Sequence, residues 1–191
     1  MQIRVHVLEK NVTVLGPGHR FGVWVQGCFR KCTGCMSPET WDPEGGMLYE
    51  AAELAEMFLR SGCDGITISG GEPFLQPEAL AEFVRLSGNP GVIVYTGFLY
   101  EELLQRPDAA ALLSVCDMII DGPFMEELRD GKNLRGSSNQ KAVLLTERYQ
   151  KEAASFGTLP TKIEFFLHDD AAHIIGIPSE EWLERMKKTK W

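Results

Sequence analysis

Three closely spaced cysteines are the residues of this sequence best suited to chemistry. Cys28, Cys32 and Cys35 follow the pattern C-x3-C-x2-C. Thiolates this close on one loop can each bind a different iron of a [4Fe-4S] cubane, which ordinarily takes four cysteines. The other two cysteines, Cys63 and Cys116, fall in other expected elements. The pattern therefore predicts a [4Fe-4S] cluster with three protein ligands and one iron left open for a further ligand.

A zinc site that lacks one ligand is the alternative to an iron-sulfur cluster. Structural zinc sites usually pair two C-x2-C hooks, or one hook with histidines. The sequence has no second hook, and His19 is the histidine nearest to the three cysteines. The spacing favours iron-sulfur ligation, and Cys63 and Cys116 are expected to be small buried apolar residues.

A glycine-rich turn, 69–73 (Ser-Gly-Gly-Glu-Pro), directly follows the short β-branched run 66–68. Two glycines let a ligand approach the backbone without meeting a Cβ atom. The carboxylate of Glu72 can accept hydrogen bonds from an ammonium group. The turn is neither a phosphate-binding loop nor a dinucleotide fingerprint. Taken alone it is weak evidence, and its meaning comes from the cysteine loop upstream.

Together the two motifs resemble those of radical S-adenosylmethionine (SAM) enzymes. The resemblance implies that the amino and carboxylate groups of SAM bind the open iron of the [4Fe-4S] cluster. Many members carry an aromatic residue just before the third cysteine, where this chain has Gly34, so Gly34 would contact adenine through its backbone alone. Asp121, at a strand end, would hold SAM or a bound cation. The SAM-site residues that the resemblance implies are Gly34, Met36, Gly70, Gly71, Glu72, Pro73, Thr96 and Asp121.

A narrower resemblance is to the activating enzymes of glycyl radical enzymes, most closely those of anaerobic (class III) ribonucleotide reductases. The segment 121–123 reads Asp-Gly-Pro where pyruvate formate-lyase activases carry Asp-Leu-Lys, which favours the reductase type. Reductase activases often have Gly-Asp-Pro in place of Gly-Glu-Pro at 71–73, and the chain is somewhat longer than usual. The matching segments, in order between residue 12 and about 145, are 16–20, 24–28, 37–41, 95–97, 121–124 and 135–140.

This resemblance implies a radical SAM oxidoreductase. Its reduced cluster would cleave SAM to a 5′-deoxyadenosyl radical, which would abstract an α-hydrogen from a glycine of a partner enzyme. The partner that the resemblance favours is anaerobic ribonucleotide reductase. A flavodoxin or ferredoxin-type protein would donate the electron. Without the resemblance, the polar segment 135–140 is as consistent with a surface loop of turn-forming residues as with a binding segment. The residues expected to face the partner or substrate are Arg135, Ser137, Ser138, Asn139 and Gln140.

Two other functions compete with the activase. The first is a radical SAM enzyme that acts on a different small molecule, peptide or protein. The second is an iron-sulfur module that only transfers electrons. The glycine-rich turn argues against the second, because an electron carrier has no use for a SAM site.

Length, charge and hydropathy narrow the class of protein. The chain has 191 residues, 44% of them hydrophobic, which suits one domain with a sizeable core. The net charge of −8 argues against a nucleic-acid partner, whose protein surface is expected to be basic. No apolar run approaches the roughly 18 residues of a membrane span, and the N-terminus has no signal-peptide core. A cytoplasmic protein without a membrane partner is expected.

The elements that position the motifs alternate between strand and helix in the middle of the chain. Such an order predicts βα units and a largely parallel sheet, with the loops after Gln26, Ile68, Tyr95 and Ile120 at one edge. Together with the resemblance, this predicts an α/β fold of the incomplete (β/α)6 radical SAM barrel type, mostly parallel and open on one side. Residues 1–191 are expected to form one domain, with a cluster loop at 27–41 and a C-terminal extension from about 146 to 191.

The two ends of the chain are expected to be hairpins. Residues 2–8 and 11–15 alternate loosely and predict one hairpin, while 163–167 and 173–177 predict another, followed by a helix capped by Ser179. The aromatic residues Trp24, Phe83, Phe165 and Phe166 are expected in the core. His6, His168 and His173 are expected to be structural or solvated.

Overall fold

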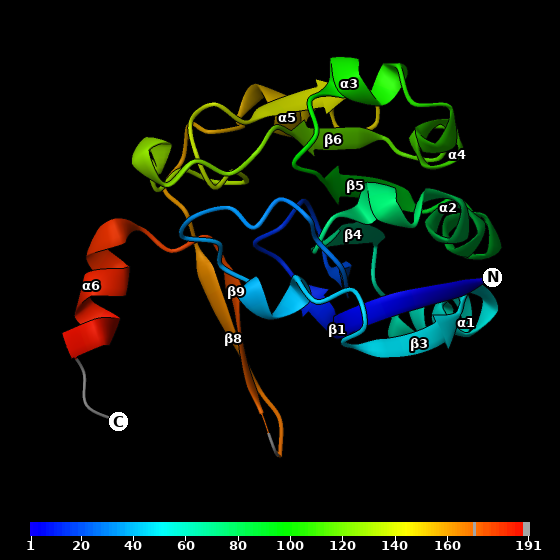
Figure 1. Cartoon of the computed structure of the whole chain (residues 1–191), viewed down its shortest axis with the longest axis horizontal. Helices are drawn as coiled ribbons and strands as arrows, with labels where there is room; N and C mark the ends of the chain where they lie inside the picture. Colours follow the sequence, from blue (N-terminus) through cyan, green and yellow to red (C-terminus); the bar gives the residue numbers. More distant parts are fainter. Residues whose placement is uncertain (170, 189–191) are drawn as a thin grey trace.

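A seven-stranded sheet forms the body of the molecule (Figure 1). The structure is a computed structural model, and it describes residues 1–169 and 171–188. The strand order is β3-β1-β2-β4-β5-β6-β7. The four central strands run parallel, and β1, β3 and β7 join them in antiparallel pairs. The strands are β1 (Gln2–Val12), β2 (Arg20–Val25), β3 (Met47–Glu50), β4 (Gly65–Gly70), β5 (Gly91–Tyr95), β6 (Met118–Asp121) and β7 (Lys141–Leu144).

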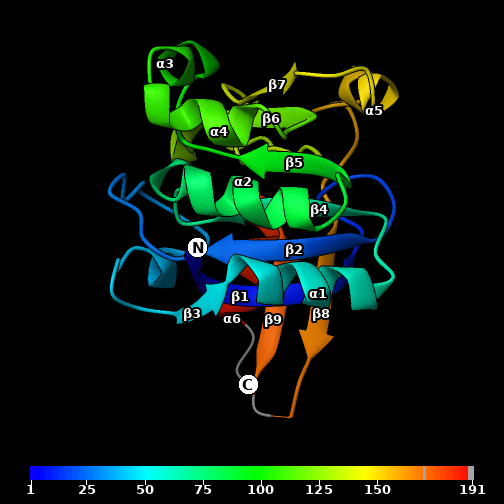
Figure 2. The same ribbon diagram turned by 90° about the vertical axis from the view of Figure 1, so that its right-hand side faces the viewer.

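Helices cover one face of this sheet, and Figure 2 shows them in front of the strands. Helix α2 begins at Pro77, which suits a first helical position because proline lacks the N–H that would go unpaired there. Helix α1 ends at Gly62, whose φ of 71° is left-handed. Fully buried Phe21, Ile66 and Leu80 belong to the core between the helices and the strands. The helices are α1 (Ala51–Ser61), α2 (Pro77–Leu86), α3 (Tyr100–Leu104) and α4 (Ala110–Leu113), with α5 (Gln150–Ala154) beyond β7.

The C-terminal part forms a separate two-stranded hairpin, which Figures 1 and 2 place on the side of the sheet opposite α1 and α2. Its strands are β8 (Ile163–Leu167) and β9 (Ala172–Gly176), and helix α6 (Glu180–Lys188) follows. The Trp182 N–H donates to Ser179 Oγ at 3.3 Å, so the expected cap at Ser179 is confirmed. The expected pairing of the two segments is confirmed as well.

The prediction of an N-terminal hairpin was wrong. Residues 2–12 form one long strand, which pairs with β2 on one side and with the unpredicted strand β3 on the other. Both neighbours come from farther along the chain, so tertiary pairing overrides the local turn pattern. Two irregularities in the register, at 5–7 and 9–12, explain the loose alternation, and Asn11 adopts a φ of 61° in the second one.

The fold is mixed α/β with a parallel centre, and the expected helical stretch at 99–115 is indeed interrupted at Pro107. Cys116 is 3% exposed as expected, whereas Cys63 is only partly buried. Phe83 lies in the core, but Phe165 is 55% exposed, so its assignment to the core was wrong. Within the described residues, no helix combines the length and apolar character needed to cross a membrane.

Arg20 ties the amino ends of three parallel-sheet elements together. It is 1% exposed, and its guanidinium group donates to Ile66 O, Gly91 O, Thr67 Oγ1 and Tyr149 OH at 2.5 to 3.0 Å. These acceptors are neutral, so the buried cation is solvated by dipoles of β4, β5 and the segment before α5. Removal of the Arg20 side chain is expected to destabilise the fold, because all four of its buried acceptors would lose their hydrogen-bond donor at once.

Replacing Arg20 with leucine is expected to lower the free energy of unfolding by about 2 to 4 kcal/mol, since carbonyls and a phenol would be left buried and unpaired. Urea unfolding of the anaerobic holoprotein measures the change. Arg60→Leu is the matched control, because the Arg60 side chain is 81% exposed. An equal decrease in the free energy of unfolding in the two variants would contradict a structural role for Arg20.

Candidate functional site

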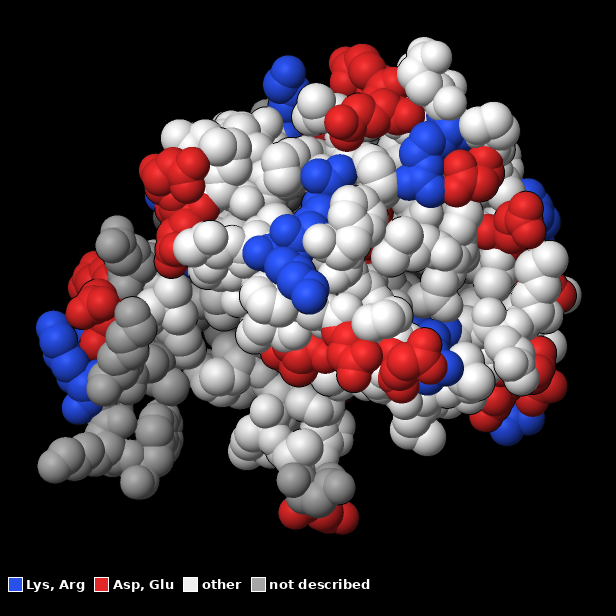
Figure 3. All heavy atoms as spheres, viewed as in Figure 1, with Lys and Arg blue, Asp and Glu red and all other residues white. Residues whose placement is uncertain are grey.

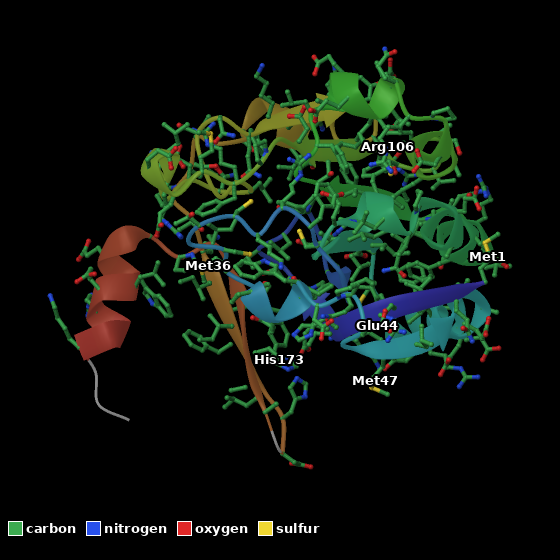
Figure 4. The ribbon with its side chains drawn as sticks, viewed as in Figure 1. Met1, Met36, Glu44, Met47, Arg106 and His173 are labelled. Carbon is green, nitrogen blue, oxygen red and sulfur yellow. The ribbon has the colours of Figure 1, made fainter. Side chains whose placement is uncertain are left out.

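A hollow lies at the carboxyl ends of the parallel strands, where the sequence analysis places the functional loops. All three cysteines of the loop 27–41 line it. The loops after β4, β5 and β6 contribute 69–72, 95–97 and Gly122. The predicted convergence of these loops is therefore confirmed. In Figure 4 the labelled Met36, which also lines the hollow, marks the cysteine loop.

The stem of the cysteine loop is fixed by backbone hydrogen bonds. Gly27 N donates to Thr40 O at 2.8 Å and Cys28 N donates to Trp41 O at 3.2 Å, so the two ends of the loop lie side by side. The buried side chain of Gln26 adds two bonds, because its Nε2 donates to the carbonyls of Glu39 and Asp42 at 3.0 and 2.7 Å. The first cysteine thus follows a hydrogen-bonded base, and several residues of the 28–36 segment line the hollow.

The glycine-rich turn packs directly against that base. Gly71 N donates to Val25 O at 2.8 Å, and Glu72 N donates to Gly27 O at 2.9 Å. A Cβ atom at residue 71 would lie 2.3 Å from Gly27 O, and one at residue 70 would lie 2.6 Å from Val25 N. Glycine is therefore required at both positions by the approach of two backbones, in addition to any ligand.

Glu72 links the turn after β4 to the loop after β5. Its carboxylate, 1% exposed, accepts hydrogen bonds from Phe74 N at 3.1 Å, Thr96 Oγ1 at 2.7 Å and Gly97 N at 2.9 Å. The Arg30 guanidinium lies 3.9 Å away. Burial raises the pKa of Glu72, although these hydrogen bonds and Arg30 act in the opposite direction. The carboxylate thus orients two loops around the hollow.

A second set of bonds joins the loops after β5 and β6 to the segment 136–140. Asp121 Oδ2 accepts from Tyr100 N at 2.8 Å, and Gly122 N donates to Phe98 O at 2.9 Å. Gln140 Nε2 then donates to Gly122 O at 3.0 Å. Each loop around the hollow is therefore hydrogen-bonded to the next one along the sheet edge.

The three cysteine sulfur atoms lie farther apart than the ligand atoms of a single zinc ion would. Cys28, Cys32 and Cys35 line the same hollow, yet their sulfur atoms do not all lie within 4.8 Å of one another. A single zinc ion holds tetrahedral thiolates at about 2.3 Å, which puts their sulfur atoms roughly 3.8 Å apart. A cubane that gives each cysteine its own iron suits the wider arrangement.

The surroundings of Cys28 disfavour a free thiolate. Burial raises the pKa of its thiol, and the charges of Glu72 and Cys32 add to the effect, while the backbone N–H groups of Arg30 and Lys31 oppose it. A thiol of raised pKa is a poor nucleophile at neutral pH, but coordination to iron deprotonates it. Cys28 is therefore poorly suited to act as a nucleophile in the absence of a metal.

Two residues that line the hollow carry a buried polar atom without a hydrogen-bond partner in the described part of the chain. Among the described residues, Tyr95 OH and Arg30 Nε are buried and have no hydrogen-bond partner. Both residues line the hollow. The Arg30 guanidinium is held 4.5 Å from the centre of the Phe98 ring, close to Glu72 and Glu102. Buried polar groups normally have partners, so these two atoms are exceptions beside the hollow.

The structure brings together many but not all of the predicted site residues. Pro73 is buried in the turn after Glu72 and does not line the hollow. Asp121 lies beneath it, and its Oδ1 atom has no partner among the described residues. Gly34 lies beside the hollow with its carbonyl accepting from Arg129 Nη2 at 3.2 Å. The predicted residues that line the hollow are Cys28, Cys32, Cys35, Met36, Gly70, Gly71, Glu72, Thr96 and Gln140.

The segment predicted to face a partner is largely turned inward. Ser137 is fully buried, and its Oγ accepts from Met125 N at 3.1 Å. Asn139 Nδ2 donates to Pro123 O at 2.8 Å, and Arg135 forms an ion pair with Asp130. Ser138 is exposed. Ser137, Asn139 and Arg135 are thus held by bonds to Met125, Pro123 and Asp130, and of the five predicted residues only Gln140 lines the hollow. Contact of this segment with a partner stays a prediction.

Several residues of the wall were not anticipated from the sequence. Tyr95 and Phe124 could have been predicted, because they lie in the matching segments 95–97 and 121–124, which also contain the predicted residues Thr96 and Asp121. Ile177, just after β9, gave no signal, because nothing local indicates that the C-terminal part returns to the hollow. The other lining residues that were missed or left without a role include Ser37, Trp41, Ser69, Gly97, Gly122 and Gly136.

Comparison with known proteins agrees with this site. The model of a family described as "4Fe-4S single cluster domain" matches residues 14–143, a range that contains all three cysteines and the glycine-rich turn. The anaerobic ribonucleoside-triphosphate reductase-activating protein of Enterobacteria phage T4 is 33% identical over 138 residues, which cover 67% of this chain and 85% of the phage protein.

Two enzymes with another name are also similar. The pyruvate formate-lyase-activating enzyme of Clostridium pasteurianum is 38% identical over 122 residues, 57% of this chain and 51% of that enzyme. The pyruvate formate-lyase 1-activating enzyme of Escherichia coli K12 is 29% identical over 190 residues, 91% of this chain and 73% of that enzyme. The chain thus spans about half the length of the Clostridium enzyme and more of the others.

Gln26→Ala is expected to weaken the cysteine loop without unfolding the sheet, because it removes two hydrogen bonds from the loop stem at a cost of about 1 to 3 kcal/mol. The measurement is iron per chain after anaerobic reconstitution, together with the half-life of the cluster absorbance in air. We expect a shorter half-life and less iron. Gln2→Ala, which removes an exposed glutamine, serves as control. Cluster lifetimes equal to wild type in Gln26→Ala would contradict this role.

Proposed function

The chain belongs to the family of 4Fe-4S single cluster domains, and from that premise we propose that it is a radical SAM activating enzyme for a glycyl radical enzyme. The observation that carries the proposal is the convergence of three cysteines and the Gly70–Glu72 turn on one hollow. The proposed substrate is a glycine residue of a partner enzyme, from which an α-hydrogen is removed. The partner that we favour is an anaerobic ribonucleotide reductase.

Cys28, Cys32 and Cys35 would hold the cluster, and its fourth corner would be free for the methionine part of SAM. When bound and reduced, such a cluster supplies the electron that cleaves SAM and yields a 5′-deoxyadenosyl radical. The protein contributes position and electrostatics. The hydrogen bonds from Gly71 and Glu72 to residues 25–27 keep the glycine-rich turn at a fixed place relative to the first cysteine. Arg30 offers positive charge beside an anionic centre.

The SAM site that we propose is the part of the hollow between the glycine-rich turn and the loops after β5 and β6. Glu72 fits the amino group, although three donors already bind its carboxylate, so the contact would use its remaining lone pairs or the nearby backbone. Met36 would lie against adenine. Gly34 and Asp121 would act from positions beside and beneath the hollow, through backbone and carboxylate respectively.

The choice of partner rests on two observations. The phage relative named as a reductase-activating protein is covered over 85% of its length. The triplet Asp121-Gly122-Pro123 lacks the lysine of pyruvate formate-lyase activases. We propose that the open sheet acts as an incomplete barrel of the radical SAM type, because β3 and β7 are not paired with each other among the described residues. An opening of this kind would admit a backbone segment of a large partner.

A flavodoxin or ferredoxin-type donor is the proposed source of the electron. The chain is acidic overall, with a net charge of −8. Figure 3 nevertheless shows Lys and Arg side chains gathered near the centre of the face viewed, over the region where Figure 1 draws the cysteine loop. Arg30 and Lys31 belong to that loop. A local positive field beside the cluster would favour an acidic electron-transfer protein.

Cys32→Ala is expected to abolish SAM cleavage while leaving the fold intact, because the loop lies outside the core. The assay combines anaerobically reconstituted protein, SAM, reductant and an anaerobic ribonucleotide reductase. It measures 5′-deoxyadenosine and the glycyl radical signal by electron paramagnetic resonance. Cys63→Ala is the matched control, because Cys63 lies outside the cluster loop and is expected to retain both signals.

Each possible result of this assay has a clear meaning. No 5′-deoxyadenosine from the wild-type protein would favour a simple electron-transfer module. SAM cleavage without a glycyl radical would favour another substrate and would sink the proposed partner, and a pyruvate formate-lyase tested in parallel would show whether that enzyme is the target. Loss of the folded state in Cys32→Ala, seen by circular dichroism, would show that the cysteine is structural.

Glu72→Ala is expected to weaken SAM binding at least tenfold, because it removes a carboxylate from the hollow and releases Thr96 and Gly97. Equilibrium binding of SAM to the reconstituted protein measures the change, and iron content shows whether the cluster still forms. Glu102→Ala is the control, since Glu102 also lies near Arg30 but is 53% exposed. Unchanged affinity in Glu72→Ala would rule out its role in the SAM site.

A further inference from the structure

We propose that Glu9, His168 and His173 form a zinc site that holds the C-terminal hairpin on the sheet. One carboxylate oxygen, Glu9 Oε1, lies 2.6 Å from His168 Nε2 and 2.5 Å from His173 Nδ1. The two imidazole rings are 4.9 Å apart, centre to centre. All three ligand atoms lie within 4.8 Å of one another. No other set of three such side chains among the described residues meets that limit.

The fold brings these residues together from distant parts of the chain. His173 is paired with Phe166, so His168 and His173 lie on the same face of the hairpin as Phe166. That face meets the sheet, where Phe166 packs against a cluster of Val12, Leu15 and Ile175. Glu9 lies at the start of a register irregularity in β1. Irregularities of this kind re-aim a side chain.

The contacts of Glu9 explain why a cation fits there. Glu9 is 5% exposed, and an ionised carboxylate removed from water needs compensation. Two imidazoles and one carboxylate are a ligand set used by zinc, with a fourth position left for water. The side chains of His168 and His173 are 44% and 29% exposed, so water can reach that position. Zinc bonds of about 2.1 Å would separate the ligand atoms to roughly 3.4 Å, which needs only small side-chain rotations.

Two neutral imidazoles that donate to the same oxygen are the alternative arrangement. It needs no metal, and it requires the proton of His168 on Nε2 and that of His173 on Nδ1. Zinc would bind the same three atoms, and each neutral imidazole would then carry its proton on its other ring nitrogen. The two arrangements therefore differ in one measurable property, the dependence of the hairpin on zinc.

The site is separate from the cysteine loop. Figure 4 shows the labelled His173 on the hairpin, away from the labelled Met36 of that loop. Glu164 makes a second attachment of the hairpin, because its carboxylate accepts hydrogen bonds from Thr13 N and Thr13 Oγ1 at 2.9 and 2.6 Å. Ile177, one residue after β9, lines the proposed SAM hollow. A metal clamp on the hairpin would therefore also hold one wall of that hollow in place.

The test uses the anaerobically reconstituted protein, so that iron occupies the cysteines. Zinc chloride is titrated in a calorimeter, and bound zinc and iron are counted by mass spectrometry after gel filtration. We expect one zinc per chain in addition to the cluster iron. Affinity should fall at least tenfold in Glu9→Gln, His168→Ala and His173→Ala. His19→Ala, which removes an exposed imidazole elsewhere, should bind zinc like the wild type.

Limited proteolysis provides a second readout. Zinc should slow cleavage after about residue 160 in the wild type and in His19→Ala, and a chelator should reverse the effect. Zinc binding that is absent, or that is equal in all five proteins, would overturn the proposal. Protection of the hairpin that depends on the histidines but not on zinc would also overturn it, in favour of hydrogen bonding alone. Iron content and circular dichroism identify any variant that has failed to fold, and the remaining two then decide.

Discussion

The site depends on the continuation of β-pairing past the end of the sheet. Strands β2 and β4 are parallel neighbours in register from Arg20 and Gly65 onward. Beyond the last pair, Gly71 and Glu72 still donate to the carbonyls of Val25 and Gly27. The same backbone that forms the sheet therefore fixes the glycine-rich turn against the first cysteine. Side chains can be exchanged around this contact, but its two backbones leave no room for a Cβ atom at residue 71.

The remaining loops are added to this contact one after another by buried polar groups. Glu72 binds the loop after β5, Asp121 and Gly122 bind the same loop from β6, and Gln140 binds Gly122. Groups of this kind are stable in the interior only when they are satisfied. Most of the polar residues near the hollow are thus occupied with positioning, and few are left unpaired for a ligand. This order makes the hollow rigid before any cofactor enters.

Features that depend on residues close together in the chain could be predicted from the sequence, and features that depend on distant residues could not. Cysteine spacing and the β-branched run before Gly70 are local, so the cluster loop, the turn and their common edge could be predicted. The inward orientation of Ser137 depends on Met125 N, and strand β3 exists because β1 accepts it. Neither partner is visible in local periodicity. The predicted N-terminal hairpin was wrong because β1 continues to Val12 and pairs with β2, after residues 13–19, and with the more distant β3.

The C-terminal hairpin shows the same limit most clearly. The pairing of its two strands is local and was predicted. Contacts with β1 and the segment after it decide which face of the hairpin packs against the sheet. The inner face carries Glu164 and the histidines with Phe166, whereas Phe165 on the outer face is 55% exposed. A count of apolar residues would turn the hairpin the other way, because Ile163, Leu167 and Ile174 lie on the same face as Phe165. Because Ile177 reaches the hollow, this orientation also decides what closes the site, so the C-terminal part of the chain helps to build the site.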